Sequence, residues 1–333
     1  MQITKNIFFY EGDFVDRSKK NYFDYYQGMA SSNFLVIKDR NQFFIDSGMY
    51  YGPHMKRIEW EMKKDNVDIN KTKYIIFSHS HPDHFLFAKK LSLDSDFKIK
   101  FMMHYDNKNL IINEDYFFEA FFNFPRQIKQ EILILPSWIL KVYLHAIKMD
   151  FDYMRCDHFF SENDVFNFGT KIEAVKLFSH STGHVGFYFP KEKIFYSGDL
   201  FDSRCSDGAG ILVSDSSYEF ALKDIDRVKK YDIEILIPGH GPAVYGRENV
   251  LHMLNQVKKG TKDYIQNILK YLPDSSSRGI RISKLTDFIF HDTIAYNGFS
   301  RRIIIYNCLK YLLKLGRAGF KIIDNRYHWF LLV

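Results

Sequence analysis

Three histidines and an aspartate fall within six positions of the segment YIIFSHSHPDHFLF, residues 74–87. Side chains alternate along an extended chain, so His79 and His81 are expected to face the same way. Pro82 ends that extended run, and Asp83 and His84 follow at the start of the next predicted helix. The spacing therefore predicts two imidazoles for one metal ion, and a carboxylate with an imidazole for a neighbouring ion. Neutral imidazole and carboxylate suit zinc, and also iron or manganese.

Further candidate ligands follow three later apolar segments. His184 lies in FSHSTGHVGF, Asp199 in FYSGDLF and His240 in LIPGHGP. Each lies in a short loop beside glycine, which lets the backbone turn sharply and approach a metal site closely. We therefore expect these side chains to meet the histidine-rich segment at one edge of a β scaffold. His180, four residues before His184, is expected to support the site without binding an ion.

These motifs together resemble those of the metallo-β-lactamase superfamily, in its dinuclear hydrolase branch, and are similar to those of glyoxalase II. The segment FFIDSG, with Asp46, resembles the first motif of that family, in which the aspartate is supporting rather than ligating. The motifs occur in the family's order, and the resemblance extends over about residues 5–250. Many members have Thr-Pro-Gly-His where this chain has Ser-Thr-Gly-His.

The resemblance implies an α/β fold, the αββα four-layer sandwich, with metal at one edge of its two sheets. It implies two divalent ions, with zinc expected before iron or manganese. It implies that the first ion is bound by His79, His81 and His184. It implies that the second ion is bound by Asp83, His84 and His240, and that Asp199 bridges the two ions. A hydroxide shared by the ions would attack a carbonyl or phosphoryl centre. Asp83 is the expected catalytic residue, because it is implied to orient that nucleophile.

The organisation along the chain predicts a catalytic domain over residues 1–250 and a smaller C-terminal domain over residues 251–333. Strand and helix patterns alternate in the first half. NFLVIKD and QFFIDSG are expected to form a hairpin with a polar turn at Lys38 to Asn41, and HMKRIEWEMKK has helical spacing. Residues 107–157 interrupt this rhythm with an aromatic, helical insertion. The C-terminal domain has the order helix, helix and two strands, which resembles a winged helix.

Composition and charge are those of an ordinary globular protein. The 333 residues are 46% hydrophobic and 26% charged, and the formal net charge is +6. The three cysteines form no CxxC pair, which favours a reducing compartment. The N-terminus lacks the apolar core of a signal peptide, and the longest apolar stretch is too short to span a bilayer. We expect a cytoplasmic protein without a transmembrane segment.

Three classes of function agree with these features. The first is a hydrolase of esters or thioesters, in which the insertion over residues 116–149 lines an apolar acyl pocket for a small-molecule substrate; the same insertion is equally suited to a homodimer interface. The second is a nuclease or phosphodiesterase, in which basic residues of the tail grip nucleic acid. These basic residues are Arg278, Arg281, Arg301, Arg302, Lys310, Lys314 and Arg317. The third is a mononuclear iron enzyme similar to the persulfide dioxygenases, against which the intact second set of ligands counts.

Overall fold

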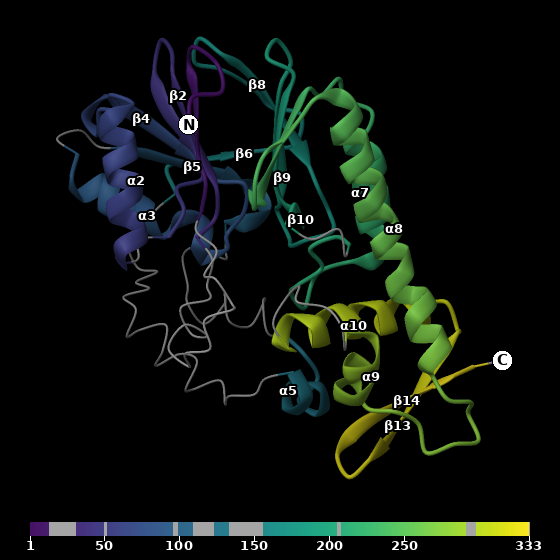
Figure 1. Ribbon diagram of the computed structural model, residues 1–333. Helices are drawn as coiled ribbons and strands as arrows, with labels where there is room; N and C mark the ends of the chain where they lie inside the picture. Colours follow the sequence, from purple (N-terminus) through teal and green to yellow (C-terminus); the bar gives the residue numbers. More distant parts are fainter. Residues whose placement is uncertain are drawn as a thin grey trace.

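Two six-stranded sheets form the centre of the protein (Figure 1). The structure is a computed structural model. It describes residues 1–12, 31–49, 52–95, 99–108, 123–132, 156–204, 208–290 and 298–332. Most of the predicted insertion, including residues 116–122 and 133–149, lies outside these ranges.

The first sheet has the strand order β1-β2-β3-β4-β5-β6. Its strands are β1 (Ile7–Tyr10), β2 (Phe34–Lys38), β3 (Gln42–Ile45), β4 (Thr72–Ile76), β5 (Lys100–His104) and β6 (His158–Phe160). The first three strands pair antiparallel, and the pairs from β3 to β6 are parallel. Lys38 pairs with Gln42, which confirms the hairpin expected around FFID. Parallel pairing brings the carboxyl ends of β3, β4 and β5 to one edge of the sheet.

The second sheet has the order β12-β11-β10-β9-β8-β7. Its strands are β7 (Val165–Asn167), β8 (Lys171–Lys176), β9 (Val185–Phe189), β10 (Ile194–Asp202), β11 (Ile235–His240) and β12 (Val244–Tyr245). The β10–β11 pair is parallel and the other pairs are antiparallel. The register of β10 against β11 shifts once before and once after Gly198, next to the predicted ligand Asp199. An irregular ladder of this kind often re-aims a side chain beside a functional site.

The alternation of side chains in the strands builds the layers. In β2, Leu35 and Ile37 face the second sheet, while Phe34 and Val36 pack with α2 (Gly52–Lys64) and α3 (Pro82–Leu93). On the far side, α7 (Tyr218–Val228) and α8 (Arg247–Tyr271) cover the second sheet. Figure 1 shows these four layers side by side. The predicted αββα sandwich is confirmed.

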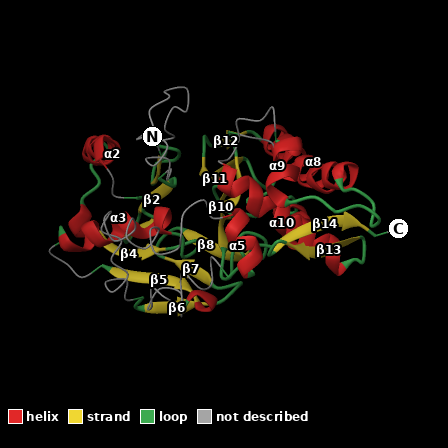
Figure 2. Ribbon diagram, turned by 90° about the horizontal axis from the view of Figure 1, so that it is seen from below, coloured by secondary structure: helices red, strands yellow, loops and turns green. Residues whose placement is uncertain are grey.

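A helical unit lies beyond the second sheet (Figures 1 and 2). It contains α5 (Arg126–Ile132), α9 (Ile282–Ile289), α10 (Gly298–Lys314) and the antiparallel strands β13 (Ala318–Ile323) and β14 (Arg326–Leu331). Two one-turn helices, η1 (Ile69–Lys71) and η2 (Tyr105–Asn107), complete the elements that the structure describes. The order of the tail is the predicted one, whereas the winged-helix likeness and the domain boundary at residue 250 stay predictions. Among the described helices, none has the length and apolar character that crossing a bilayer requires.

Candidate metal centre

Two loops and the final parts of two strands bring the candidate ligands together at one edge of the two sheets. The first loop follows β4 and ends where Pro82 begins α3, so that Asp83 lies in the first turn of the helix. The second joins β8 to β9 and carries His180 and His184. Asp199 follows the irregular step in β10, and His240 ends β11. Loops at the ends of strands present these side chains because the sheets behind them are rigid.

A first group of possible ligands consists of His79, His81, His180 and Asp199, whose ligand atoms lie within 4.8 Å of one another. His81 Nδ1 lies 3.0 Å from His180 Nε2. The carboxylate atom Oδ2 of Asp199 lies 3.5 Å from His180 Nε2 and 3.8 Å from His79 Nε2. All four side chains are buried.

A second group consists of Asp83, His84, Asp199 and His240. His84 Nε2 lies 3.1 Å from Asp199 Oδ1, and His240 Nε2 lies 3.4 Å from Asp199 Oδ2. His240 Nε2 also lies 3.1 Å from Asp83 Oδ2. Asp199 therefore belongs to both groups and stands between them.

The donor atoms fit a pair of divalent ions. Two ligands on one tetrahedral zinc, each at about 2.0–2.1 Å, are roughly 3.3 Å apart, which is close to the separations found here. His79 Nε2 and His84 Nε2 are fully buried, yet neither has a hydrogen-bond partner among the described residues. Leaving a buried polar atom without a hydrogen bond is costly, so two such atoms facing one carboxylate indicate that this site binds a cation.

The geometry reverses the expected parts of His180 and His184. His184 is in neither group, because its Nε2 accepts a hydrogen bond of 3.1 Å from the backbone N–H of Asp199. His180, expected only to support the site, directs Nε2 toward His81 and Asp199. The sequence offers two histidines four positions apart in one loop, and their spacing alone does not choose between them.

Asp46 contacts the second group through His84. It accepts hydrogen bonds from Ser78 N and Ser78 Oγ, both at 2.7 Å, and from the Tyr196 hydroxyl at 2.6 Å. Its Oδ2 lies 2.7 Å from His84 Nδ1. Because His84 donates its Nδ1 proton to this carboxylate, the lone pair of Nε2 faces the second group. The sequence reasoning did not single out Tyr196, which lies in an apolar strand.

Asn33 is another functional residue that the sequence did not reveal. Its side-chain amide donates hydrogen bonds of 2.8 Å to Pro238 O and 2.6 Å to Gly241 O. Its backbone N–H donates to Gly239 O at 2.7 Å. These bonds hold the backbone on both sides of His240 from the residue that precedes β2, more than 200 positions earlier in the chain.

Charge is shared unevenly among the buried histidines. Burial, followed by the neighbouring His84, holds the pKa of His79 well below its usual range. Burial also opposes protonation of His240, but Asp199 and Asp83 outweigh it and raise the pKa of His240 to about 10. Carboxylates thus attract positive charge to the second group, and a divalent ion satisfies the same attraction once the imidazoles are neutral.

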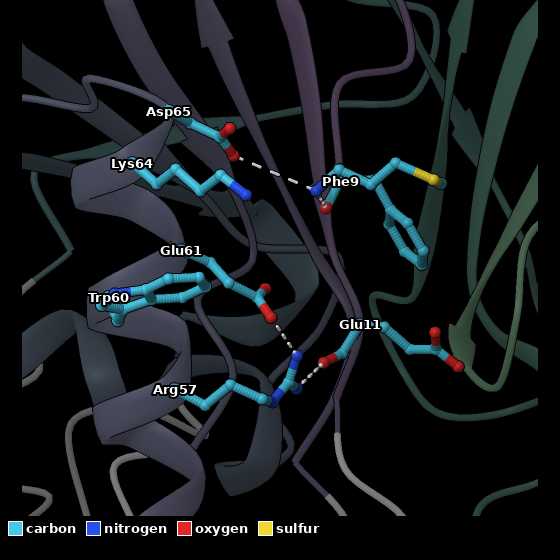
Figure 3. A pocket seen from close by; sticks show the side chains of 8 residues that line it. Phe9, Glu11, Arg57, Trp60, Glu61, Lys64 and Asp65 are labelled. Atoms are coloured by element: carbon cyan, nitrogen blue, oxygen red, sulfur yellow. Dashed lines mark hydrogen bonds and ion pairs between the residues drawn. The ribbon is translucent and has the colours of Figure 1, made fainter.

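Two hollows lie away from these groups. A cavity of about 370 Å³ between α2 and β1 is lined by polar side chains and by the exposed Trp60 (Figure 3). In it, Arg57 bonds Glu61 at 2.7 Å. A second cavity, of about 650 Å³, opens beside the β2–β3 turn. Neither cavity is lined by a residue of the two ligand groups. The histidines His104 and His158 are not members of the two ligand groups.

Comparison with known proteins agrees with this geometry. The family model of the metallo-beta-lactamase superfamily matches residues 28–240. A metallo-beta-lactamase family protein from Thermus thermophilus superposes with a TM-score of 0.74 at 14% identity, covering 99% of this chain and 100% of that chain. A beta-lactamase domain protein from Burkholderia ambifaria gives a TM-score of 0.71 at 14% identity, covering 99% and 94%. The chain therefore belongs to the metallo-β-lactamase superfamily.

Proposed function

We propose that the protein is a metal-dependent hydrolase that cleaves an ester or thioester bond in a small molecule. The observation that supports this most directly is the pair of four-residue groups that share Asp199. A single structural zinc site needs only four ligands and encloses its ion, whereas two adjoining groups with a shared carboxylate suit a catalytic pair.

Each side chain has a definite part in this proposal. The first ion is held by His79, His81 and His180, and the second by Asp83, His84 and His240, with Asp199 between them. Zinc suits the imidazole-rich set, and iron or manganese suits it as well. When bound, two such ions lower the pKa of a water and polarise the oxygen of the bond to be cleaved. Asp46 and His184 hold His84 and Asp199 in place.

Asp83 is the proposed catalytic side chain. It and His240 are the most exposed members of the second group, with 20% and 16% of their side chains accessible, so a substrate approaches from their side. The other members of the second group are at most 8% exposed. A carboxylate at the open side can orient an attacking water and accept its proton.

Nucleic acid remains the alternative substrate class. Four of the basic residues expected to bind phosphates already pair with other groups of the same chain. The pairs are Arg278 with Asp324, Arg302 with Glu131 O, Lys310 with Ser214 O, and Lys314 with Glu219. Cations already paired in this way contribute less to a phosphate-binding surface.

The completeness of the second ligand group counts against a mononuclear iron enzyme of the persulfide dioxygenase type. The homodimer and the cytoplasmic location stay predictions.

A substrate panel with defined metals tests the proposal. We expect two ions per chain and turnover of chromogenic thioesters or esters, with β-lactam and phosphodiester substrates hydrolysed more slowly. Asp83→Asn should lose at least about 100-fold in kcat, since a positioned acid or base typically contributes a factor of 10² to 10⁴. Asp94→Asn, at the other end of the same helix, is the matched control.

The outcomes separate the alternatives. Cleavage of phosphodiesters alone would replace the proposal with a nuclease. One iron per chain with consumption of oxygen would replace it with an oxygenase. A purified chain that binds no divalent ion would remove the metal-dependent account entirely.

A further inference from the structure

The segment at residues 209–217, between β10 and α7, wraps the loop that carries His180. His180 Nδ1 is hydrogen-bonded to Gly210 O, and Ser216 Oγ donates to His180 O. Because Nδ1 carries the proton of this bond, Nε2 holds the lone pair that faces the first ligand group. The carbonyl of Gly210 therefore sets both the tautomer and the ring orientation of His180.

The same segment has almost no freedom to move relative to the ligands. A Cβ atom built on Gly210 would lie 2.4 Å from Asp199 O and 3.3 Å from His180 Nδ1. The backbone N–H of Gly210 donates to Leu200 O at 2.9 Å. A displacement of Gly210 would consequently move the carbonyl away from His180 or press the backbone against Asp199.

Helix α10 of the C-terminal unit holds this segment from its other side. The side-chain amide of Asn307 donates to Ile211 O at 3.1 Å and to Val213 O at 2.9 Å. One turn further along the helix, Lys310 Nζ donates to Ser214 O at 2.7 Å. Asn307 is only 2% exposed, so water cannot replace its two bonds.

A short chain of contacts thus joins α10 to His180, a proposed ligand. It runs from the Asn307 amide through the carbonyls of residues 211 and 213 to Gly210 O and then to His180. The groups on this path are buried, and the first link in it lies almost 100 positions away from the segment in the sequence. Mutation of residues that orient a ligand from outside the coordination sphere typically costs about 10- to 100-fold in metal affinity or activity.

We propose that Asn307 is a positioning residue for the metal centre, and that α10 fixes His180 through residues 209–214. The inference deepens the proposed function and rests on it, because it requires that His180 binds an ion. It assigns to the C-terminal unit a part in metal binding that is separate from any contact with substrate. Lys310 contributes in the same direction through Ser214 O.

The test uses Asn307→Asp in the full-length protein. Aspartate has the shape of asparagine but no amide protons, and its carboxylate would face two carbonyl oxygens. We expect the affinity for the first ion, titrated as zinc against a competing chelator, to fall by about 3- to 10-fold. In protein loaded with one equivalent of Co(II), the visible absorption bands should shift, because they report the geometry of the imidazole ligands.

Two further variants make the result interpretable. Cys308→Ala removes a buried side chain from the neighbouring position of α10 but none of the hydrogen bonds from α10 to residues 209–214, so it should leave zinc affinity and the Co(II) spectrum unchanged. Lys310→Met keeps the aliphatic stem and loses the bond to Ser214 O together with the ammonium over the Tyr306 ring. It should weaken binding of the first ion if Asn307→Asp fails to fold. Parent-like zinc affinity and Co(II) spectra in both test variants would overturn the inference. A parent protein that binds no ion would instead overturn the proposed function.

Discussion

The second ion should depend on Asp46 through the proton of His84. In the variant Asp46→Asn, an amide replaces a carboxylate that accepts bonds from Ser78 N, Ser78 Oγ, Tyr196 and His84. If the new NH₂ group takes the place of Oδ1, it faces the backbone N–H of Ser78, which is a fixed donor. If it takes the place of Oδ2, it faces His84 Nδ1, which must then give up its proton.

The second orientation has the clearer consequence. Hydroxyl groups of Ser78 and Tyr196 can rotate to accept, but His84 can accept only by moving its proton to Nε2. That proton would then point at the second ligand group, where a metal ion requires a lone pair. Changes of this kind typically weaken metal binding by 10- to 100-fold, or about 1.4–2.7 kcal/mol for one ion.

Asparagine is also the best-matched replacement for the backbone. Asp46 has φ of 57°, in the left-handed region that asparagine tolerates better than alanine does. The assay is a zinc titration of metal-free protein against a chelator, with the zinc content measured after dialysis. We expect the weaker binding step to be lost or weakened and the first ion to be retained.

Tyr196→Phe is the control for this experiment. It removes one donor to the same carboxylate oxygen and the contact with Asn33 O but leaves the acceptor of His84 unchanged, so its effect on zinc affinity should stay within about threefold. If Asp46→Asn binds two zinc ions with affinities within threefold of those of the parent, the reasoning from the tautomer of His84 is refuted.

The same structure supports four further predictions. Gly239→Ala should abolish binding of the second ion in the zinc titration, because a Cβ there would lie 2.1 Å from Asp199 Oδ1; an unaltered stoichiometry would contradict this. Asp224→Ala should lower the free energy of urea unfolding by about 2–4 kcal/mol, because it leaves the buried N–H groups of Phe178 and Ser179 unpaired. Burial raises the pKa of Asp224 to about 6 from its usual 3.8, so its protonation stabilises the fold at low pH and that contribution is lost as the pH rises through 6. The free energy of unfolding of Asp224→Asn, relative to that of the parent, should therefore increase between pH 4 and 7. A difference that stays constant with pH would contradict this prediction. Removing metal with a chelator should lower the unfolding temperature, since an ion at 100 times its Kd stabilises the fold by about 2.7 kcal/mol, and an unchanged midpoint would argue against a native metal centre.

The sequence by itself determined the elements and the local ligand motif. The hairpin around FFID and the placing of Asp83 in the first turn of a helix depend on alternation, on proline and on apolar periodicity within about 15 residues. These are short-range steric and hydrophobic effects, so they can be read from neighbouring residues. The membership of the superfamily followed from the same motifs because their order along the chain is part of the pattern.

Only the tertiary structure decided which histidine of the HSTGH loop faces the ligand groups. His180 and His184 have the same chemistry and nearly the same local surroundings, and the choice depends on Gly210 O and Asp199 N, which come from another strand and loop. The contributions of Asn33 and Asn307 were hidden for the same reason. Each acts through hydrogen bonds to backbone carbonyls far away in the sequence, and those partners exist only once the two sheets and the C-terminal unit have packed.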